Sequence, residues 1–267
     1  MTYHTLEIIH QGLRATIWLN RPDVRNAFNE TSIAEITQAF HVLDKDRDVR
    51  VIVLAARGSA FCAGADLNWM KKMASYSEEE NFADAQALAE MMQVIYACNK
   101  PTIARVQGDC YAGGMGLVAA CDMALAVDAA GFCLSEVRLG LIPATISPYV
   151  IRAIGERASR RYFLTAERFD AQEARRIGLV HEVVAEDQLD HEVDKLVHAL
   201  LACSPHAIDE AKRLLRDVSG ETIEPELVTE TVRRIAQIRV SEQGREGVQA
   251  FLNKRKPAWL IDATNAS

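Results

Sequence analysis

The sequence predicts an α/β protein that ends in a helical region. Segments rich in β-branched residues alternate with segments of helical periodicity as far as about residue 186. Beyond that point every periodic segment is helical, and no long linker or low-complexity stretch interrupts the chain. Two of the expected strands lead into turns of small residues, each followed by a helical pattern. We therefore expect a core over residues 1–190 and a helical region over residues 191–267.

The first expected strands are residues 15–20 (ATIWLN) and 49–56 (VRVIVLAA). Between them, Ser32 and Glu35 have the spacing of a capping box, which predicts the start of a helix. The apolar residues around and after this box recur at helical spacing and are Ile33, Ile36, Phe40 and Leu43. These segments predict a strand–helix–strand unit at the beginning of the chain.

Further strands are expected at residues 101–108 and 178–184, and two short ones within residues 123–136. A helix is expected to begin at Asp170, where an acidic cap is followed three residues later by glutamate. The remaining patterns carry helical periodicity from about residue 186 to residue 256. The order of elements thus changes from alternating to purely helical.

Composition places the chain among ordinary globular proteins. It is 49% hydrophobic and 25% charged, and its net charge of −7 argues against general nucleic-acid binding, which needs a basic surface. The sequence shows no signal-peptide pattern and no apolar run of about 20 residues, so we expect a cytoplasmic protein without a membrane partner. The six cysteines include no C-x-x-C pair and the histidines are scattered, so we expect buried thiols and no metal.

The segment QGDCYAGGMGLVAACDM (107–123) is unusually rich in glycine at the start of an expected helix. Its four glycines are Gly108, Gly113, Gly114 and Gly116. Each glycine weakens a helix by roughly 1 kcal/mol relative to alanine, so another requirement must favour glycine here. The pattern predicts that another group closely approaches this backbone.

One interpretation of these glycines is a dinucleotide site. Gly114-Met-Gly116-Leu-Val-Ala119 matches G-x-G-x-x-[GA], and Glu136 lies where a ribose-binding acid would be expected. However, two strands and a helix precede the motif, and the chain after Glu136 lacks the strand–helix units of a doubly wound sheet. An NAD-dependent oxidoreductase is therefore kept only as an alternative.

A second turn of small residues, SAFCAGADLNWM (59–70), favours a different interpretation. It also follows an expected strand. Two such turns in one domain can aim backbone N–H groups at a single ligand atom and stabilise an oxyanion, at roughly 3–4 kcal/mol per donor. Tight helix–strand packing would explain one turn easily and both turns less well.

These motifs together carry a family resemblance. FCAGADL, VQGDCYAGGMGLVAACDM, SEVRLGLIPA and the tail FLNKRKPAW resemble the crotonase superfamily of enoyl-CoA hydratases and isomerases, over essentially the whole chain. The resemblance implies a spiral of ββα units, a C-terminal helical trimerisation region and an acyl-CoA thioester substrate. It also implies a homotrimer or a dimer of trimers, and no cofactor beyond the coenzyme A of the substrate.

The resemblance also implies roles for individual residues. The backbone N–H groups of Ala65 and Gly113 would bind the thioester oxygen, and Glu136 would move the proton at Cα. Residues that would contact coenzyme A are Asp23, Val24, Arg25, Ala27, Cys62, Ala63, Asp66 and Leu67. Residues that would line the acyl pocket are Trp69, Met70, Gly114, Gly116 and Leu141.

One catalytic residue of the typical family pattern is absent. Typical enoyl-CoA hydratases carry two glutamates that hold a water molecule; here Glu136 matches the second, and Gly116 stands at the position of the first. This departure puts ordinary two-glutamate hydration in doubt. Glu136 lies beside an apolar segment, so we expect a raised pKa, which suits proton exchange at Cα.

The segments SEVRLGLIPATISPYV and GADLNWM are most similar to bacterial hydratases of 3-methylglutaconyl-CoA and isohexenylglutaconyl-CoA, which act in leucine and acyclic terpene breakdown. We therefore expect hydration of a branched glutaconyl-CoA ester whose own carboxylate occupies the space freed at Gly116. Arg138 and Arg152 are candidates to pair with that carboxylate. The alternatives are a Δ3,Δ2-enoyl-CoA isomerase that uses Glu136 alone and a non-catalytic acyl-CoA-binding protein.

Overall fold

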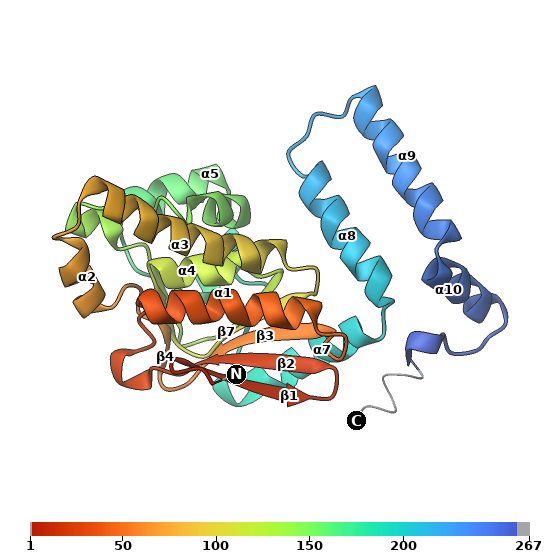
Figure 1. Cartoon of the computed structure of the whole chain (residues 1–267), viewed down its shortest axis with the longest axis horizontal. Coiled ribbons are helices and arrows are strands. Elements are labelled where there is room, and N and C mark those ends of the chain that lie inside the picture. Colours follow the sequence, from red (N-terminus) through yellow and green to blue (C-terminus); the bar gives the residue numbers. More distant parts are fainter. Residues whose placement is uncertain (1, 261–267) are drawn as a thin grey trace.

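The computed structural model describes residues 2–260 and contains two sheets (Figure 1). The larger sheet has the strand order β1-β2-β3-β5-β7-β10 and the smaller one β4-β6-β8-β9. The strands of the larger sheet are β1 (Leu6–Gln11), β2 (Arg14–Leu19), β3 (Val51–Ala56), β5 (Thr102–Val106), β7 (Met123–Val127) and β10 (Glu182–Val184). Those of the smaller sheet are β4 (Ala60–Cys62), β6 (Asp109–Tyr111), β8 (Gly131–Cys133) and β9 (Phe169–Asp170).

The helices surround these sheets or follow them in the chain. They are α1 (Glu30–Lys45), α2 (Leu67–Met73), α3 (Glu78–Ala97), α4 (Gly113–Ala120), α5 (Ser147–Thr165), α6 (Ala171–Ile177), α7 (Leu189–Leu201), α8 (Pro205–Val218), α9 (Pro225–Val240) and α10 (Glu242–Leu252). Short 3-10 helices are η1 (Pro22–Val24), η2 (Glu136–Leu139) and η3 (Glu186–Gln188). None of the helices within residues 2–260 is both long and apolar enough to cross a membrane.

The core is built from a repeated ββα unit. β3 and β4 precede α2, β5 and β6 precede α4, and β7 and β8 precede α5. In each unit the first strand joins the larger sheet and the second joins the smaller one, and equivalent strands pair in parallel. All six side chains of β3 are buried, as expected for a parallel strand covered on both faces. The expected spiral of ββα units is therefore confirmed.

The expected strands are found, but the start of α1 differs from the expectation. Its N-cap is Asn29, which forms a capping box with Ser32, so the helix begins before the expected Ser32–Glu35 box. Glu35 is instead a buried carboxylate that accepts hydrogen bonds from the Thr5 N–H and hydroxyl at 2.8 and 2.6 Å. Sequence spacing alone did not distinguish these two caps, because the partner of Glu35 comes from the N-terminal segment.

The C-terminal helices project away from the core, whereas α7 packs against the larger sheet through Leu189, Val193 and Val197 (Figure 1). The expected boundary at residue 190 falls at the beginning of α7. Lys212 is the buried residue of α8, and its ammonium donates to the Lys100 carbonyl at 2.7 Å and to the Asp122 carboxylate. This contact attaches the first projecting helix to the core.

We predict that Lys212→Ala lowers the free energy of unfolding by about 3 kcal/mol, because it leaves the Asp122 carboxylate without its cation in a partly buried place. Urea unfolding at pH 7 measures this loss. The control is Lys195→Ala, which breaks an exposed pair with Glu192 and should cost at most about 1 kcal/mol. Equal losses for the two variants would contradict the anchoring role.

Candidate functional site

Three loops meet at one edge of the smaller sheet. Ala65 follows the end of β4, Gly113 the end of β6 and Glu136 the end of β8, and these three strands lie side by side in parallel. A Cβ atom added to Gly64 would lie 3.0 Å from the Cβ of Ala112, so the first two loops are in contact. The structure therefore brings together the three residues that sequence analysis assigned to catalysis.

The Ala65 N–H is available to a ligand because of the way its neighbours are paired. The Phe28 N–H donates to the Gly64 carbonyl at 2.8 Å, and the Asp66 N–H donates to the Phe28 carbonyl at 2.9 Å. Successive peptide groups of an extended chain point in opposite directions, so the intervening Ala65 N–H points away from Phe28. Within residues 2–260 it donates to no acceptor.

The Gly113 N–H is available for a different reason. Gly113 is the first residue of α4, and an N–H in the first turn of a helix has no acceptor within that helix. The N-cap Ala112 has φ 48° and ψ −124°, a conformation that is costly for a residue with a side chain. The Ala112 N–H donates to the Cys133 carbonyl at 2.8 Å, which holds this turn against β8. The helix dipole adds positive potential at the same place.

Glu136 supplies the only carboxyl group among the assigned catalytic positions. It begins η2, and burial raises the pKa of its carboxyl, against a weaker opposing hydrogen bond from its own N–H. The Oε2 atom is buried and has no hydrogen-bond partner within residues 2–260. A half-buried glutamate with a raised pKa and one enclosed oxygen suits the transfer of a proton to or from a bound substrate.

The structure corrects the expectation for Gly116, which was that the missing acid leaves open space. A Cβ at Gly116 would lie 2.3 Å from Cγ2 of Ile146 and 3.1 Å from Cε of Met92. Ile146 is buried and caps the start of α5. An apolar side chain therefore fills the space next to Gly116, and a substrate carboxylate has no room there.

Two further residues assigned to ligand contact serve the fold through their side chains. The Cys62 thiol is fully buried, which raises its pKa to about 12, and a Cβ on Gly114 would lie 2.8 Å from the Cys62 Cβ. Trp69 is buried, and its indole N–H donates to the Asp84 carboxylate at 2.9 Å, which ties α2 to α3. Gly114 and Gly116 thus have packing reasons to lack a side chain, and their motif needs no dinucleotide to explain it.

The two segments assigned to coenzyme A lie side by side. The Ala63 N–H donates to the Arg25 carbonyl at 3.0 Å, which joins residues 23–27 to residues 62–67. Arg25 pairs with Asp109 at 2.8 Å, while Val24 and Leu67 are exposed. The remaining acyl-pocket assignments are a half-buried Met70 and an exposed Leu141. Contact of these residues with coenzyme A or an acyl chain stays a prediction.

Sequence analysis missed Arg21, which holds the Ala65 loop from outside. Its guanidinium donates to the Asp66 carboxylate at 2.8 Å and to the Ala27 carbonyl. Burial tends to raise the pKa of Asp66, but hydrogen bonds from Arg21 and from the first turn of α2 outweigh it and lower that pKa. Sequence analysis assigned ligand contacts from Asp23 onward and gave Arg21 no role, since no local pattern shows that Arg21 and Asp66 meet.

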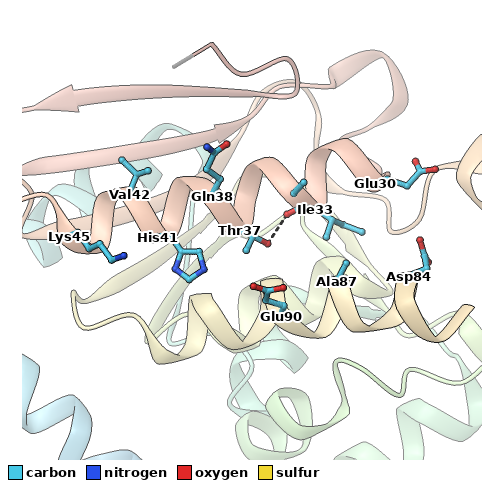
Figure 2. A pocket seen from close by; sticks show the side chains of 11 residues that line it. Glu30, Ile33, Thr37, Gln38, His41, Val42, Lys45, Asp84, Ala87 and Glu90 are labelled. Carbon is cyan, nitrogen blue, oxygen red and sulfur yellow. Dashed lines mark hydrogen bonds between the residues drawn. The ribbon is translucent and has the colours of Figure 1, made fainter. Parts of the chain in front are cut away.

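A separate groove of about 490 Å³ lies between α1 and α3 (Figure 2). Its lining side chains come from these two helices and include Ile33, His41 and Glu90. It contains neither the two backbone donors nor Glu136. The candidate active site is therefore the edge of the smaller sheet and not this groove.

Comparison with known proteins shows the family of the chain. Residues 10–261 match the family described as enoyl-CoA hydratase/isomerase. The chain belongs to the enoyl-CoA hydratase/isomerase family. It is 32% identical to a putative enoyl-CoA hydratase of Thermus thermophilus, over 94% of this chain and 99% of the relative. It is 30% identical to a peroxisomal Delta(3,5)-Delta(2,4)-dienoyl-CoA isomerase of Arabidopsis thaliana, over 97% and 98% of the two chains.

Solved structures of the family are also similar to this chain. An enoyl-CoA hydratase from Shewanella pealeana is 45% identical, with a TM-score of 0.94 over 96% of both chains. A putative enoyl-CoA hydratase/isomerase from Legionella pneumophila is 45% identical, with a TM-score of 0.91 over 96% of this chain and 98% of the other. These comparisons establish the family, which includes both hydratases and isomerases.

We predict that Glu136→Gln abolishes turnover and stabilises the fold at neutral pH. A carboxyl whose pKa is raised by folding costs stability progressively as pH rises above its unfolded value of about 4.5, and glutamine avoids that cost. In urea unfolding, the gain over the unsubstituted protein should therefore appear as pH rises above about 4.5 and become constant once pH exceeds the folded-state pKa.

The control for this variant is Glu167→Gln. A hydrogen bond from Arg161 lowers the pKa of Glu167, so its removal should reduce stability at neutral pH, the opposite sign. Retained turnover in Glu136→Gln would exclude Glu136 as the proton-transfer group, and a gain that does not change with pH would contradict its raised pKa.

We predict that Gly116→Ala destabilises the protein by about 1–3 kcal/mol, because its methyl group overlaps Ile146. Gly116→Glu should lose stability for the same reason, whatever the charge of the substrate. The double variant Gly116→Ala/Ile146→Ala should be more stable than the sum of the two single losses predicts. Additive losses in urea unfolding would show that Ile146 does not fill this space.

Proposed function

We propose that the protein is an enoyl-CoA hydratase that acts on a carboxylated substrate, a branched glutaconyl-CoA ester. The observation that carries the enoyl-CoA chemistry is the buried Glu136 oxygen, which shares one sheet edge with two backbone donors; none of the three groups has a partner within residues 2–260. No cofactor beyond the coenzyme A of the substrate is needed for this chemistry. The cytoplasmic location inferred from the sequence is part of the same proposal.

In the proposed reaction the thioester oxygen accepts hydrogen bonds from Ala65 and Gly113. These bonds withdraw electrons from the conjugated double bond and stabilise the enolate that forms when water adds to Cβ. The water oxygen becomes the hydroxyl at Cβ, Glu136 accepts the proton that the water loses, and Glu136 then delivers a proton to Cα. The double bond is consumed, and the product carries the elements of one water molecule.

In this scheme Glu136 acts both as the base that accepts a proton from water and as the acid that protonates Cα. Ile146 fills the space beside Gly116, so no second carboxylate faces it from that helix position. The pKa of the Glu136 carboxyl, raised by burial, supports both roles, because a weaker acid is a better base toward water and still carries a proton that it can deliver. The apolar Ile146 side chain would help to exclude surplus water.

Arg138 is our candidate for binding the substrate carboxylate. It lies two residues after Glu136 in η2, is exposed, and has no ion-pair partner within residues 2–260. Arg152, the other candidate from the sequence, already donates to the Tyr96 hydroxyl at 3.1 Å. An unpaired guanidinium at the rim of the site fits a carboxylate better than an engaged one.

A Δ3,Δ2-enoyl-CoA isomerase is the second candidate function. Shifting a double bond needs one base that removes a proton from one carbon and returns it to another. The single carboxyl at Glu136 and the apolar neighbour Ile146 favour this reaction, because no second group is present to hold water at Gly116. Both candidates use the same two backbone donors.

We propose that the protein assembles as a homotrimer or a dimer of trimers through its C-terminal helices. α9 has no buried residue and carries exposed apolar side chains on one face, Val228, Val232 and Ile235. Their spacing of four and three residues makes a continuous stripe along the helix. Such a stripe is stable in water when a second copy of the chain covers it.

We predict how the purified protein distinguishes three substrates: crotonyl-CoA, 3-methylglutaconyl-CoA and a β,γ-unsaturated acyl-CoA. A hydratase removes the conjugated thioester absorbance and adds the mass of one water molecule, fastest on the glutaconyl ester. An isomerase increases this absorbance from the β,γ-unsaturated ester without a change in mass. The second result would replace the hydratase proposal, and no turnover of any ester would overturn both.

We predict that Arg138→Gln raises KM for 3-methylglutaconyl-CoA by roughly 10-fold or more, as expected for loss of one charge-assisted hydrogen bond, and leaves KM for crotonyl-CoA unchanged. The matched control is Arg157→Gln, an exposed arginine of α5 without an ion-pair partner within residues 2–260. Equal effects of Arg138→Gln on the two esters would exclude Arg138 as the residue that recognises the second carboxylate.

A further inference from the structure

Phe28 lies between the two backbone donors and contacts both of their loops. Its N–H donates to the Gly64 carbonyl at 2.8 Å, and its carbonyl accepts from the Asp66 N–H at 2.9 Å. These two bonds flank Ala65 on both sides and form an isolated parallel bridge. The main chain of Phe28 therefore sets the position and direction of the Ala65 N–H.

The Phe28 side chain reaches the other donor. A Cβ added to Gly113 would lie 2.7 Å from both Cε2 and Cζ of the Phe28 ring. The ring is buried, with 2% of the residue exposed, so it cannot move aside into solvent. Glycine is needed at position 113 because the flat ring occupies the place of a side chain.

Arg21 makes the Phe28 main chain rigid. One nitrogen of its guanidinium donates to the carbonyl of Ala27, the residue before Phe28, and the other binds the carboxylate of Asp66, the residue after Ala65. The same carboxylate caps α2 by accepting from the Asn68 N–H at 2.8 Å. With its main chain held in this way, the Phe28 ring packs against Gly113, next to the direct contact between Gly64 and Ala112.

We propose that Phe28 is a positioning residue that sets the separation of the two oxyanion donors. Its main chain holds the Ala65 N–H, and its ring holds the Gly113 N–H at a fixed distance. Oxyanion donors act only when both lie about 2.7–3.1 Å from the same oxygen, so a small change in their separation weakens catalysis. This inference rests on the proposed function, in which both N–H groups bind the thioester oxygen.

The test is a double-mutant cycle of Phe28→Leu and Gly113→Ala. Phe28→Leu removes the ring atoms nearest Gly113, and Gly113→Ala places a methyl group against the intact ring. We expect each single variant to lower kcat by roughly 10-fold or more, with KM changed less than about threefold. In the double variant the methyl group enters the space left by the ring, so kcat should exceed that of Gly113→Ala alone.

A second readout separates positioning from simple loss of packing. The infrared carbonyl frequency of a bound, unreactive acyl-CoA thioester reports how strongly the two donors polarise it. Phe28→Leu should reduce the shift of this frequency on binding. The control is Phe40→Leu, another fully buried phenylalanine, on α1, which should lose stability without changing the carbonyl shift or kcat.

Two results would overturn the inference. If the fold-loss of kcat in the double variant equals the product of the two single fold-losses, the ring and Gly113 act independently. If Phe28→Leu keeps the full carbonyl shift and kcat, its ring does not position the donors. Failure of the part of the proposed function on which this inference rests is distinct: if the two N–H groups do not bind the thioester oxygen, the unsubstituted protein itself shows no carbonyl shift, and the inference falls with it.

Discussion

The parallel pairing of β4, β6 and β8 is the constraint on which the candidate site depends. Each of these strands has only three residues, so the pairing has few hydrogen bonds of its own. Close backbone packing supports it: a Cβ at Gly108 would lie 2.1 Å from the Ser59 carbonyl oxygen. Because the three strands run in the same direction, their following loops emerge together, and residues separated by more than 70 positions in the chain meet at one edge.

The three polar groups assigned to the site at this edge have no partner within residues 2–260, and each has a structural cause. Ala65 lies on the free side of a β-bridge, Gly113 begins a helix, and Glu136 begins a short 3-10 turn where one of its carboxyl oxygens is enclosed. The Glu136 Oε2 atom is buried without a partner within residues 2–260, which destabilises a fold, so its place beside the two N–H groups supports the assignment of a ligand site. The apolar contact between Gly116 and Ile146 completes this arrangement by closing the position of a second acid.

The C-terminal helices differ from one another in how they are attached to the core. α8 is attached to the core through a buried ammonium, whereas α9 buries none of its residues in the single chain. The Lys212 ammonium donates to two specific acceptors on the core. This contact therefore fixes the place at which the helices leave the core. The apolar faces beyond it remain exposed in the single chain.

Local features of the sequence determined the order of strands and helices, the two turns of small residues, and the carboxyl group at Glu136. Each of these features depends on only a few neighbouring residues. Periodicity, glycine content and an acid beside an apolar segment can therefore be recognised in the sequence itself. The very short strands β4, β6 and β9 have too few residues for a period and appeared only in the structure. The family resemblance implied which N–H groups of these turns would bind the thioester oxygen.

Tertiary structure alone decided what fills the space at each glycine and which side chains remain free. The atoms facing Gly113 and Gly116 belong to Phe28 and Ile146, which are 85 and 30 residues away along the chain. Glu35 likewise became a buried acceptor for Thr5 and not a helix cap. In each case the contacting residue is distant in sequence, and the local pattern carries no information about which residue it is.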